Sequence, residues 1–528
     1  MTNFELFSPY TVICVGGLAV LLLEAFKKRP TQVYSGYLAL ATQALALALV
    51  WRQILLAKSG DLSGSGLFRN AIHIDSFGLF VCAIILVTSL IASIGAIDYL
   101  ERKQIRHGEY HSFQLFAVLG MMLMVVSMEL VTLFISLELM SLPIYVMCGY
   151  RRDRSEGIES SLKYFILGGF AAAVLIFGIA HIYGQTQSTD LSEIAVALRT
   201  GEVAGEAIAN MALLKLGIGL LAAGLLFKIA AVPLHFWLPD VYEGAPAPVT
   251  GFMAAGVKAA AFAVLIKFLY VGYTGDPGAA APSNPLLLEP FDQIIVVFAC
   301  MTMLIPNLIA LRQTSVKRIL AYSSIAHAGY MLVGVRAMSS SHGLGGDQAV
   351  AALLYYLMVY GIMTVGAFVI VGRLTGDEKD FSSLESLNGL GYQKPFLSTV
   401  LAICVLSMAG APPLAGFWGK YLVFKSAVDQ GFVALAVFAV FTSVVAVYYY
   451  LRILVHLYMR PPLESTVHNA PATAPTLFRG WDFNVALGAV GFAMLWLGIG
   501  PISLFNVIPD CSRFWNWAQF AAYALAEM

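Results

Sequence analysis

Long apolar runs with few or no charges recur along the whole chain. A helix needs about 20 apolar residues to cross the hydrocarbon layer of a bilayer, which is roughly 30 Å thick. The 528 residues contain fourteen such runs, separated by polar segments or by glycine and proline. The runs lie near residues 10–26, 33–57, 74–98, 113–128, 130–149, 163–184, 212–238, 249–272, 292–311, 318–337, 350–373, 396–425, 431–457 and 482–504. The sequence therefore predicts an all-α polytopic membrane protein with about fourteen transmembrane helices.

Composition excludes an ordinary soluble domain. Apolar residues make up 59% of the chain and charged residues only 12%, whereas a soluble domain carries about a quarter charged residues. Lys and Arg together equal Asp and Glu at 31 each, so overall charge gives no reason to expect a nucleic-acid partner. The six cysteines are scattered, and no metal, iron-sulfur, haem or nucleotide-binding spacing occurs. We therefore expect no cofactor in this chain, and any redox chemistry would come from another polypeptide.

Lys and Arg are concentrated in alternate loops, which predicts the orientation because cytoplasmic loops hold the excess of basic residues. The basic set contains Lys27, Lys28, Arg29, Arg102, Lys103, Arg106, Arg151, Arg152, Arg154, Arg312, Lys317, Arg318, Arg373, Lys379, Lys394, Arg460 and Arg479. The other set offers only Lys58, Arg69, Arg199 and Arg336. Both termini should therefore face away from the basic side, on the periplasmic face of a bacterial inner membrane.

Two predicted helices are interrupted by proline in a matching way. One reads KIAAVPLHFWLPD from Lys228, and the other reads GAPPLAGFWGK up to Lys420. Proline breaks a helix, and a broken helix persists in a membrane only where it is buried in protein or lines a wet cavity. The breaks lie five segments apart, and an odd number of helices inverts a repeat. The pattern predicts two inverted five-helix repeats, as in many transporters.

This organisation divides the chain into four predicted parts. Residues 1–112 form a three-helix membrane segment, 113–272 the first repeat and 292–457 the second repeat. Residues 458–528 contain a loop, the last transmembrane helix and a tail.

Five ionisable residues fall inside predicted helices: Glu138, Lys228, Lys258, His327 and Lys420. An ionisable group at bilayer depth costs about 2.5 to 3.5 kcal/mol even on the mildest scale, so each one needs a partner or a function. At helical rise Glu138 lies about 12 Å into its segment, too deep for a short acid to reach water, and Lys258 lies about 13 Å into its own. Lys228 and Lys420 lie beside the two proline breaks.

Other charged residues have simpler explanations. A lysine or arginine near a segment end can extend its stem to the interface, and we expect this of Lys163, Lys215, Lys267 and Arg452. Glu24 lies one turn from Lys27 and Lys28, which favours an interfacial ion pair.

The histidines divide into two groups. For His327 and for His235, which follows the first break, a hydrogen-bonded structural role stays open beside a functional one. Six others fall in loops or near segment ends and give no functional signal: His73, His107, His111, His342, His456 and His468.

The deep residues together could carry protons. Burial disfavours the charged form of a lysine and a nearby carboxylate favours it, so a change at Glu138 could switch Lys228 between its two forms. His327 can pass protons in either direction because imidazole titrates near neutral pH. The residues therefore indicate an ion or proton translocator that uses Glu138, Lys228, Lys258, His327 and Lys420. A structural scaffold would not retain three lysines in mid-bilayer.

Several long motifs also resemble a known family. They read LFISLELMSLPIYV, KIAAVPLHFWLPDVYEGAPAPVTGFMAAGVKAAAF, QTSVKRILAYSSIAHAGYMLVG and SMAGAPPLAGFWGKYLVF. These motifs resemble the antiporter-like membrane subunits of respiratory complex I, NADH:quinone oxidoreductase, and in particular the N subunit (subunit 2) type. The resemblance covers about residues 70–460. Residues 276–290 and 461–480 do not match, and 1–69 match weakly.

The resemblance implies a role for each deep residue. Glu138 and Lys228 would be the paired acid and base of the first half-channel, Lys258 the connecting lysine and Lys420 the terminal lysine at the exit. His327 would lie on the central axis of the second repeat. The implied function is proton translocation driven by NADH oxidation and quinone reduction in partner subunits, which would hold FMN, iron-sulfur clusters and the quinone site. Neighbouring antiporter-like subunits would be further partners.

Two other functions stay open. A subunit of an Mrp-type Na⁺/H⁺ antiporter belongs to the same family and would use the same lysines. Related hydrogenase or ferredoxin-driven complexes form the second alternative.

Overall fold

The computed structural model describes most of the chain. The described residues are 3–26, 32–59, 65–69, 71–105, 107–203, 205–274, 289–339, 344–374, 383–462, 481–499 and 512–526. The unmatched loops 276–290 and 461–480 lie almost entirely outside these residues.

Helices account for nearly all of the described structure. The first half contains α1 (Asn3–Phe26), α2 (Gln32–Lys58), α3 (Ser76–Arg102), α4 (Glu109–Val126), α5 (Leu130–Cys148), α6 (Ser155–Thr186), α7 (Leu191–Thr200), α8 (Met211–Lys228), α9 (Leu238–Gly244), α10 (Ala247–Phe252), the π-helix η1 (Met253–Val257) and α11 (Lys258–Thr274). The second half contains α12 (Glu289–Ala310), α13 (Val316–Ser339), α14 (Leu344–Leu374), the 3₁₀-helix η3 (Leu384–Leu387), α15 (Leu390–Gln393), α16 (Pro395–Ala409), α17 (Ala415–Asp429), α18 (Val433–Tyr458), α19 (Trp481–Ile499) and α20 (Ser512–Ala526).

Two short antiparallel hairpins join helices. β1 (Ser65–Leu67) pairs with β2 (Ile72–Ile74), and β3 (Glu202–Val203) pairs with β4 (Glu206–Ala207). Side chains cap the helices that follow: Asp75 accepts from Gly78 N at the start of α3, and Asn210 accepts from Leu213 N at the start of α8.

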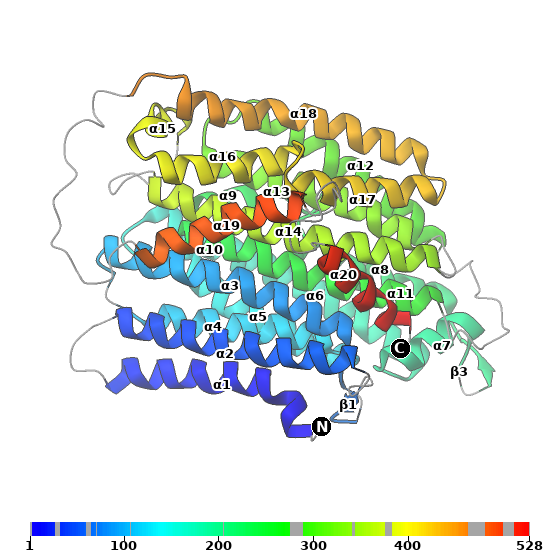
Figure 1. Cartoon of the computed structure of the whole chain (residues 1–528). Coiled ribbons are helices and arrows are strands. Elements are labelled where there is room, and N and C mark those ends of the chain that lie inside the picture. The colour runs from blue at the N-terminus through cyan, green and yellow to red at the C-terminus, as the bar shows by residue number, and fades with distance from the viewer. Residues whose placement is uncertain are drawn as a thin grey trace.

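The long helices lie side by side with their axes roughly aligned across Figure 1. Two long helical stretches form the centre, residues 247–270 (α10, η1 and α11) and 346–374 (α14), and their most apolar windows are entirely buried. The peripheral helices instead expose apolar side chains such as Phe170 and Val444. This distribution fits a bundle whose outer surface meets lipid.

Within the described residues, eleven helical stretches are long and apolar enough to cross a membrane, by length and composition. The predicted segments 318–337, 396–425 and 482–504 correspond to α13, to α16 with α17, and to α19, which fall outside that criterion. The prediction of a polytopic helical membrane protein is confirmed, whereas the count of fourteen spans and the inverted repeats stay predictions. The predicted C-terminal tail contains α20, a helix that sequence reasoning did not identify.

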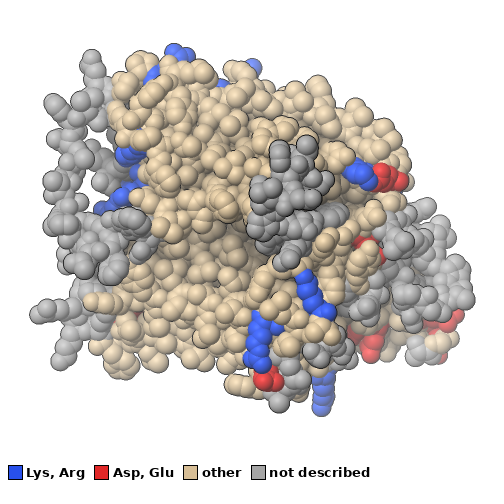
Figure 2. Space-filling model, viewed as in Figure 1, with Lys and Arg blue, Asp and Glu red and all other residues tan. Residues whose placement is uncertain are grey.

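Loops that carry residues of the predicted basic set lie close together at one end of the bundle, which we call the basic end. The hydroxyl of Tyr150 donates to the His107 carbonyl, which joins the loops after α5 and α3, and Arg373 pairs with Asp98 at 2.5 Å. Most of the visible face in Figure 2 is uncharged; Lys and Arg lie along its upper left edge, below its centre and at its right, and most of the visible Asp and Glu lie in its right half.

Candidate functional site

The first helix break positions Lys228. This lysine is the last residue of α8, and residues 229–237 are not helical before α9 begins. The backbone groups freed by the break have partners from other elements: Trp237 Nε1 donates to the Phe227 carbonyl at 3.3 Å, and Thr302 Oγ1 of α12 accepts from Val232 N at 2.9 Å. The break is therefore a buried feature of the fold, as proline in a membrane helix requires.

Lys228 is buried, with 2% of its surface exposed, and its contacts come from α5 and α6. Nζ donates to Ser141 Oγ at 2.9 Å and to the Tyr145 hydroxyl at 3.4 Å. It also lies 5.5 Å from the ring centre of Tyr145 and 5.6 Å from that of Tyr164. All of these partners are neutral.

Glu138 lies one turn before Ser141 on α5 and interacts electrostatically with Lys228. Among the described residues, its buried Oε1 has no hydrogen-bonding partner. The predicted acid and base therefore belong to one cluster, but Ser141 and Tyr145 rather than the carboxylate hold the ammonium. A buried carboxylate oxygen without a partner is costly, which makes this acid a candidate for proton binding.

Lys258 begins α11 directly after the π-helix η1. π-helical segments occur mostly as local bulges, frequently at functional sites. Only 1% of Lys258 is exposed, and Nζ donates to the Ser324 carbonyl at 2.5 Å and to Ser324 Oγ at 2.6 Å. Ser324 Oγ in turn lies 2.7 Å from the Tyr360 hydroxyl on α14.

His327 lies one turn after Ser324 on α13 and is 1% exposed. Nδ1 lies 2.6 Å from the Tyr356 hydroxyl of α14, and Nε2 lies 3.1 Å from the Tyr450 hydroxyl of α18. Both ring nitrogens thus have a partner that can donate or accept a proton. Tyr450 also bonds the hydroxyl of Ser323.

The second break positions Lys420 in a similar way. Helix α16 ends at Ala409 and α17 begins at Ala415. Lys420 Nζ donates to the Ala409 carbonyl at 3.2 Å and to Ser443 Oγ at 2.8 Å, so the ammonium caps the C-terminus of α16. Nζ lies 5.0 Å from the ring centre of Tyr330.

Buried tyrosines connect the second half of the site, and sequence reasoning missed them. Asn307 Nδ2 donates to the Tyr330 hydroxyl at 3.1 Å, and Asn307 Oδ1 accepts from Tyr449 at 2.8 Å. The rings of Tyr449 and Tyr450 lie 4.5 Å apart, which brings this group to His327. Lys258, His327 and Lys420 therefore share one continuous aromatic and polar region, whereas Lys228 and Glu138 form a separate cluster.

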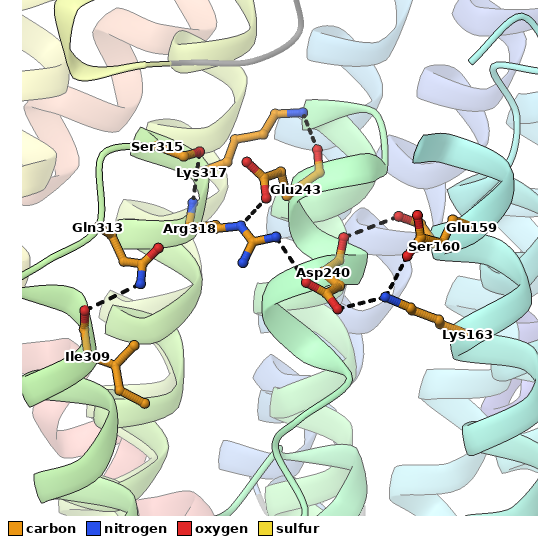
Figure 3. Close-up of polar contacts among 10 residues, drawn as sticks. All are labelled: Glu159, Ser160, Lys163, Asp240, Glu243, Ile309, Gln313, Ser315, Lys317 and Arg318. Atoms are coloured by element: carbon orange, nitrogen blue, oxygen red, sulfur yellow. Dashed lines mark hydrogen bonds and ion pairs between the residues drawn. The ribbon is translucent and has the colours of Figure 1, made fainter. Parts of the chain in front are cut away.

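Sequence reasoning also missed a group of charged side chains that lies close to the first helix break, toward the basic end of the bundle. Arg318 of α13 bonds Glu243 and pairs with Asp240 at 3.0 Å, and Lys163 of α6 pairs with Asp240 at 2.8 Å (Figure 3). Lys163 also pairs with Glu159 at 2.6 Å. A cavity of about 110 Å³ opens between these residues. Asp240 and Glu243 both fall inside the long PDVYEGAPAPV motif, which was the available signal.

One expectation about a side chain near a segment end is wrong. Lys267 does not extend to the interface: it is 2% exposed and donates to the Val125 carbonyl at the end of α4. His111 lies near the start of α4, as expected, but its side chain is completely buried. His235 is partly exposed, and its Nδ1 lies 3.3 Å from the Pro233 carbonyl.

Comparisons with known proteins agree on one family. The model of the NADH:quinone oxidoreductase/Mrp antiporter transmembrane family matches residues 127–446, which include all five predicted site residues. The chain belongs to this family. NADH-quinone oxidoreductase subunit N of Trichlorobacter lovleyi is 36% identical over 88% of this chain and 89% of the relative. Subunit N 1 of Sorangium cellulosum is 38% identical over 95% of this chain and 96% of the relative.

Solved structures show the same fold. One chain of respiratory complex I from Thermus thermophilus aligns with a TM-score of 0.72 and 32% identity, over 94% of this chain and 98% of that one. A chain of the Mrp complex from Dietzia sp. aligns with a TM-score of 0.79 and 21% identity, over 100% of this chain and 98% of that one, which shows the fold alone. Membership of the family makes the chain a multi-pass membrane protein of the kind found in enzyme complexes that oxidise NADH and reduce quinone.

Proposed function

We propose that this chain is a proton-translocating membrane subunit of an NADH:quinone oxidoreductase. Protons pass through two clusters, Glu138 with Lys228 and then Lys258, His327 and Lys420. FMN, iron-sulfur clusters and the quinone site belong to partner subunits, and other antiporter-like subunits are neighbours in the membrane. The chain lies in a bacterial inner membrane with both termini on the periplasmic side.

The observation that carries the proposal is the set of three buried lysines whose hydrogen-bonding partners are all neutral. Lys228, Lys258 and Lys420 are held by hydroxyls and carbonyls. An unpaired buried charge is strongly destabilising, and these three lysines also lie beside a helix break or a π-helix, which favours them as proton carriers. Neutral partners allow the amine to exist with or without its proton.

The chemistry of the partners supports transfer between these groups. Hydroxyls of serine and tyrosine both donate and accept, so they can pass a proton without being lost as partners. Lys258, Ser324 and Tyr360 form one such group, and His327 with Tyr356 and Tyr450 forms the next. Since Ser324 and His327 are one turn apart on α13, the two groups face the same region.

At the first cluster, the charge of the Glu138 carboxylate controls whether Lys228 holds its proton. A charged Glu138 favours the ammonium form of Lys228, and protonation of Glu138 removes that attraction. The ion-pair group around Asp240 and Arg318 encloses a cavity of about 110 Å³, and in this proposal water enters there on its way to the break. Proton uptake from the basic side is then coupled to the charge of Lys228.

Variants of the assembled complex test the proposal. Lys228→Ala and Glu138→Ala should lower both NADH-driven acid pulses and coupled activity without preventing insertion. Unchanged acid pulses in either variant would remove the assignment of this pair.

The helix α17 offers a matched comparison for the terminal lysine. Lys420 is 5% exposed, whereas Lys425 lies on the surface of the same helix and pairs with Asp429 at 2.6 Å. We expect Lys420→Ala to lower proton pumping and Lys425→Ala to leave it unchanged. Equal effects from the two variants would show that the loss reflects damage to α17 rather than proton transfer.

The alternative is a subunit of an Mrp-type Na⁺/H⁺ antiporter, which the family description and the fold of the Dietzia chain favour. Gentle purification from the native membrane, followed by mass spectrometry, separates the two. Recovery with flavin and iron-sulfur subunits supports the redox-driven complex and identifies its electron donor, including a ferredoxin-driven relative. Recovery only with antiporter subunits would show that the same lysines serve Na⁺/H⁺ exchange driven by an ion gradient.

A further inference from the structure

Buried polar atoms without a partner gather in the first four helices of the chain. Among the described residues they include Gln43 Oε1, Gln53 Oε1, Asp75 Oδ2, Tyr110 OH, both ring nitrogens of His111 and Gln114 Oε1. All of them lie before residue 127, where the match to the family model begins. The proposed pathway therefore does not account for them.

His111 is the most unusual of these residues. It lies in the first turn of α4, none of its surface is exposed, and neither ring nitrogen has a partner in the described structure. The ring nitrogens of a buried histidine normally bond the protein, as those of His327 do with two tyrosines. A Cβ added to Gly36 of α2 would lie 3.0 Å from His111 Nε2, so the glycine allows this helix to approach the ring.

Further polar groups extend from His111 into the membrane. Gln114 lies one turn later on α4, and its Nε2 donates to the carbonyl and the hydroxyl of Ser89 at 3.1 and 3.2 Å. Ser93, one turn from Ser89 on α3, accepts from Gln43 Nε2 at 2.8 Å. Both glutamines use their amide nitrogen for the protein and keep a buried carbonyl oxygen unpartnered. Each of these oxygens is an acceptor that needs a donor.

We call His111, Gln114, Ser89, Ser93 and Gln43 the polar row. The His111 end of this row lies at the basic end of the bundle. The carboxylate of Glu24 on α1 accepts from the hydroxyl of Ser35 and from Gly108 N, which lies 3.3 Å away. Ser35 directly precedes Gly36, and Gly108 lies three residues before His111. Glu24 therefore lies at the end of the row that is nearest to the membrane surface. The ion pair expected between Glu24 and Lys27 or Lys28 falls outside the described residues.

The inner end approaches the proposed pathway. Thr88, beside Ser89 on α3, lies close to Gly361 of α14, where an added Cβ would be 2.8 Å from Thr88 Cγ2 and 3.7 Å from Ala255 Cβ. Ala255 belongs to η1, the π-helix that directly precedes Lys258. The three elements that meet at this point therefore include the π-helix that directly precedes Lys258.

Buried polar atoms in folded proteins are almost always bonded to protein or to ordered water. In this row the protein supplies no partner for the acceptors and the ring nitrogens, and the residues connect one membrane surface with the interior. We infer that α1 to α4 bind a chain of water molecules and that His111 takes up and releases protons along it, as an additional intake from the basic side toward Lys258. This inference rests on the proposed function.

The experiment uses the intact complex in native membranes and compares two histidines. His107 is exposed in the loop just before α4, and its Nδ1 lies 3.9 Å from Glu109 Oε2, so His107→Gln is the matched control for His111→Gln. We expect His111→Gln to lower the number of protons pumped per NADH oxidised and His107→Gln to leave it unchanged. An unchanged ratio in His111→Gln would overturn the inference.

A second measurement does not depend on any variant. A high-resolution cryo-electron microscopy map of the unmodified complex should show ordered water at the nitrogens of His111 and at Oε1 of Gln43 and Gln114. A dry site would overturn the inference even if His111→Gln failed to assemble. The two proposals can fail separately: normal pumping in His111→Gln with a loss in Lys228→Ala removes only the N-terminal intake, whereas normal pumping in Lys228→Ala removes the proposed function.

Discussion

The close contact between Gly416 and Ser407 makes the second helix break sensitive to a single methyl group. Gly416 N donates to Ser407 Oγ at 2.9 Å, which joins the start of α17 to the last turn of α16. A Cβ added at Gly416 would lie 1.9 Å from the Ser407 carbonyl oxygen and 2.6 Å from its carbonyl carbon. Carbon and oxygen atoms normally approach no closer than about 3.3 Å. The alanine therefore fits only if the two backbones move apart by more than 1 Å.

The obstacle is backbone, so no rotamer change can relieve it. Overpacking of a buried site costs about 1 to 3 kcal/mol, and occasionally more. We expect Gly416→Ala to lie at or above about 3 kcal/mol, because the required movement also lengthens the Gly416 N to Ser407 Oγ bond, which is worth about 1 kcal/mol. Lys420 lies one turn further along α17, so its contacts with the Ala409 carbonyl should weaken too.

Thermal unfolding of the purified complex in detergent measures this cost. Gly169→Ala on α6 is the control, because an added Cβ there meets nothing within 4 Å and alanine stabilises a helix by about 0.5 to 1 kcal/mol relative to glycine. We expect a lower melting temperature and weaker proton pumping for Gly416→Ala, and an unchanged or higher melting temperature for Gly169→Ala. The reasoning is refuted if Gly416→Ala melts no lower than Gly169→Ala.

Three further predictions concern the polar partners of the site. Ser141→Ala removes the shorter of the two hydrogen bonds of Lys228. We expect the assembled complex to lose about 1 to 3 kcal/mol of stability and to pump protons more slowly. Ser155→Ala on the surface should change neither quantity. Tyr356→Phe removes the hydroxyl beside His327 Nδ1 and keeps the ring. We expect the complex to assemble normally but to pump protons more slowly. Equal pumping rates in the variant and the wild type would exclude this hydroxyl from the proton pathway. Arg318→Ala removes partially exposed ion pairs to Asp240 and Glu243, so we expect at most about 1 kcal/mol of destabilisation, smaller at high salt; a melting temperature with no salt dependence would argue against this origin.

Much of the site could be predicted because charge is rare inside a membrane. Glu138, Lys228, Lys258, His327 and Lys420 stand out in apolar runs, and the structure places each of them in the interior or beside it. The prolines in the two breaks were equally visible. Their roles in proton transfer stay predictions, as do the four-part division of the chain and the inverted repeats.

The rest of the site was not visible for a physical reason. Tyrosine is common in apolar helices, and a sequence does not show which hydroxyl lies beside which side chain. Tyr356, Tyr360 and Tyr450 converge on His327 and Ser324 only because α13, α14 and α18 pack together. The same holds for Lys267, whose partner carbonyl is supplied by the end of α4 rather than by the interface.

The two breaks hold their lysines in different electrostatic surroundings, and this difference bears on the direction of transfer. Lys228 has a carboxylate within electrostatic reach, so a proton at this cluster can shift between acid and base. His327 instead lies within reach of both Lys258 and Lys420. Like charges oppose one another, so a proton that arrives on Lys258 raises the free energy of a proton already on His327. In the proposed pathway, each proton that arrives on Lys258 therefore favours release of a proton from His327 toward the second break.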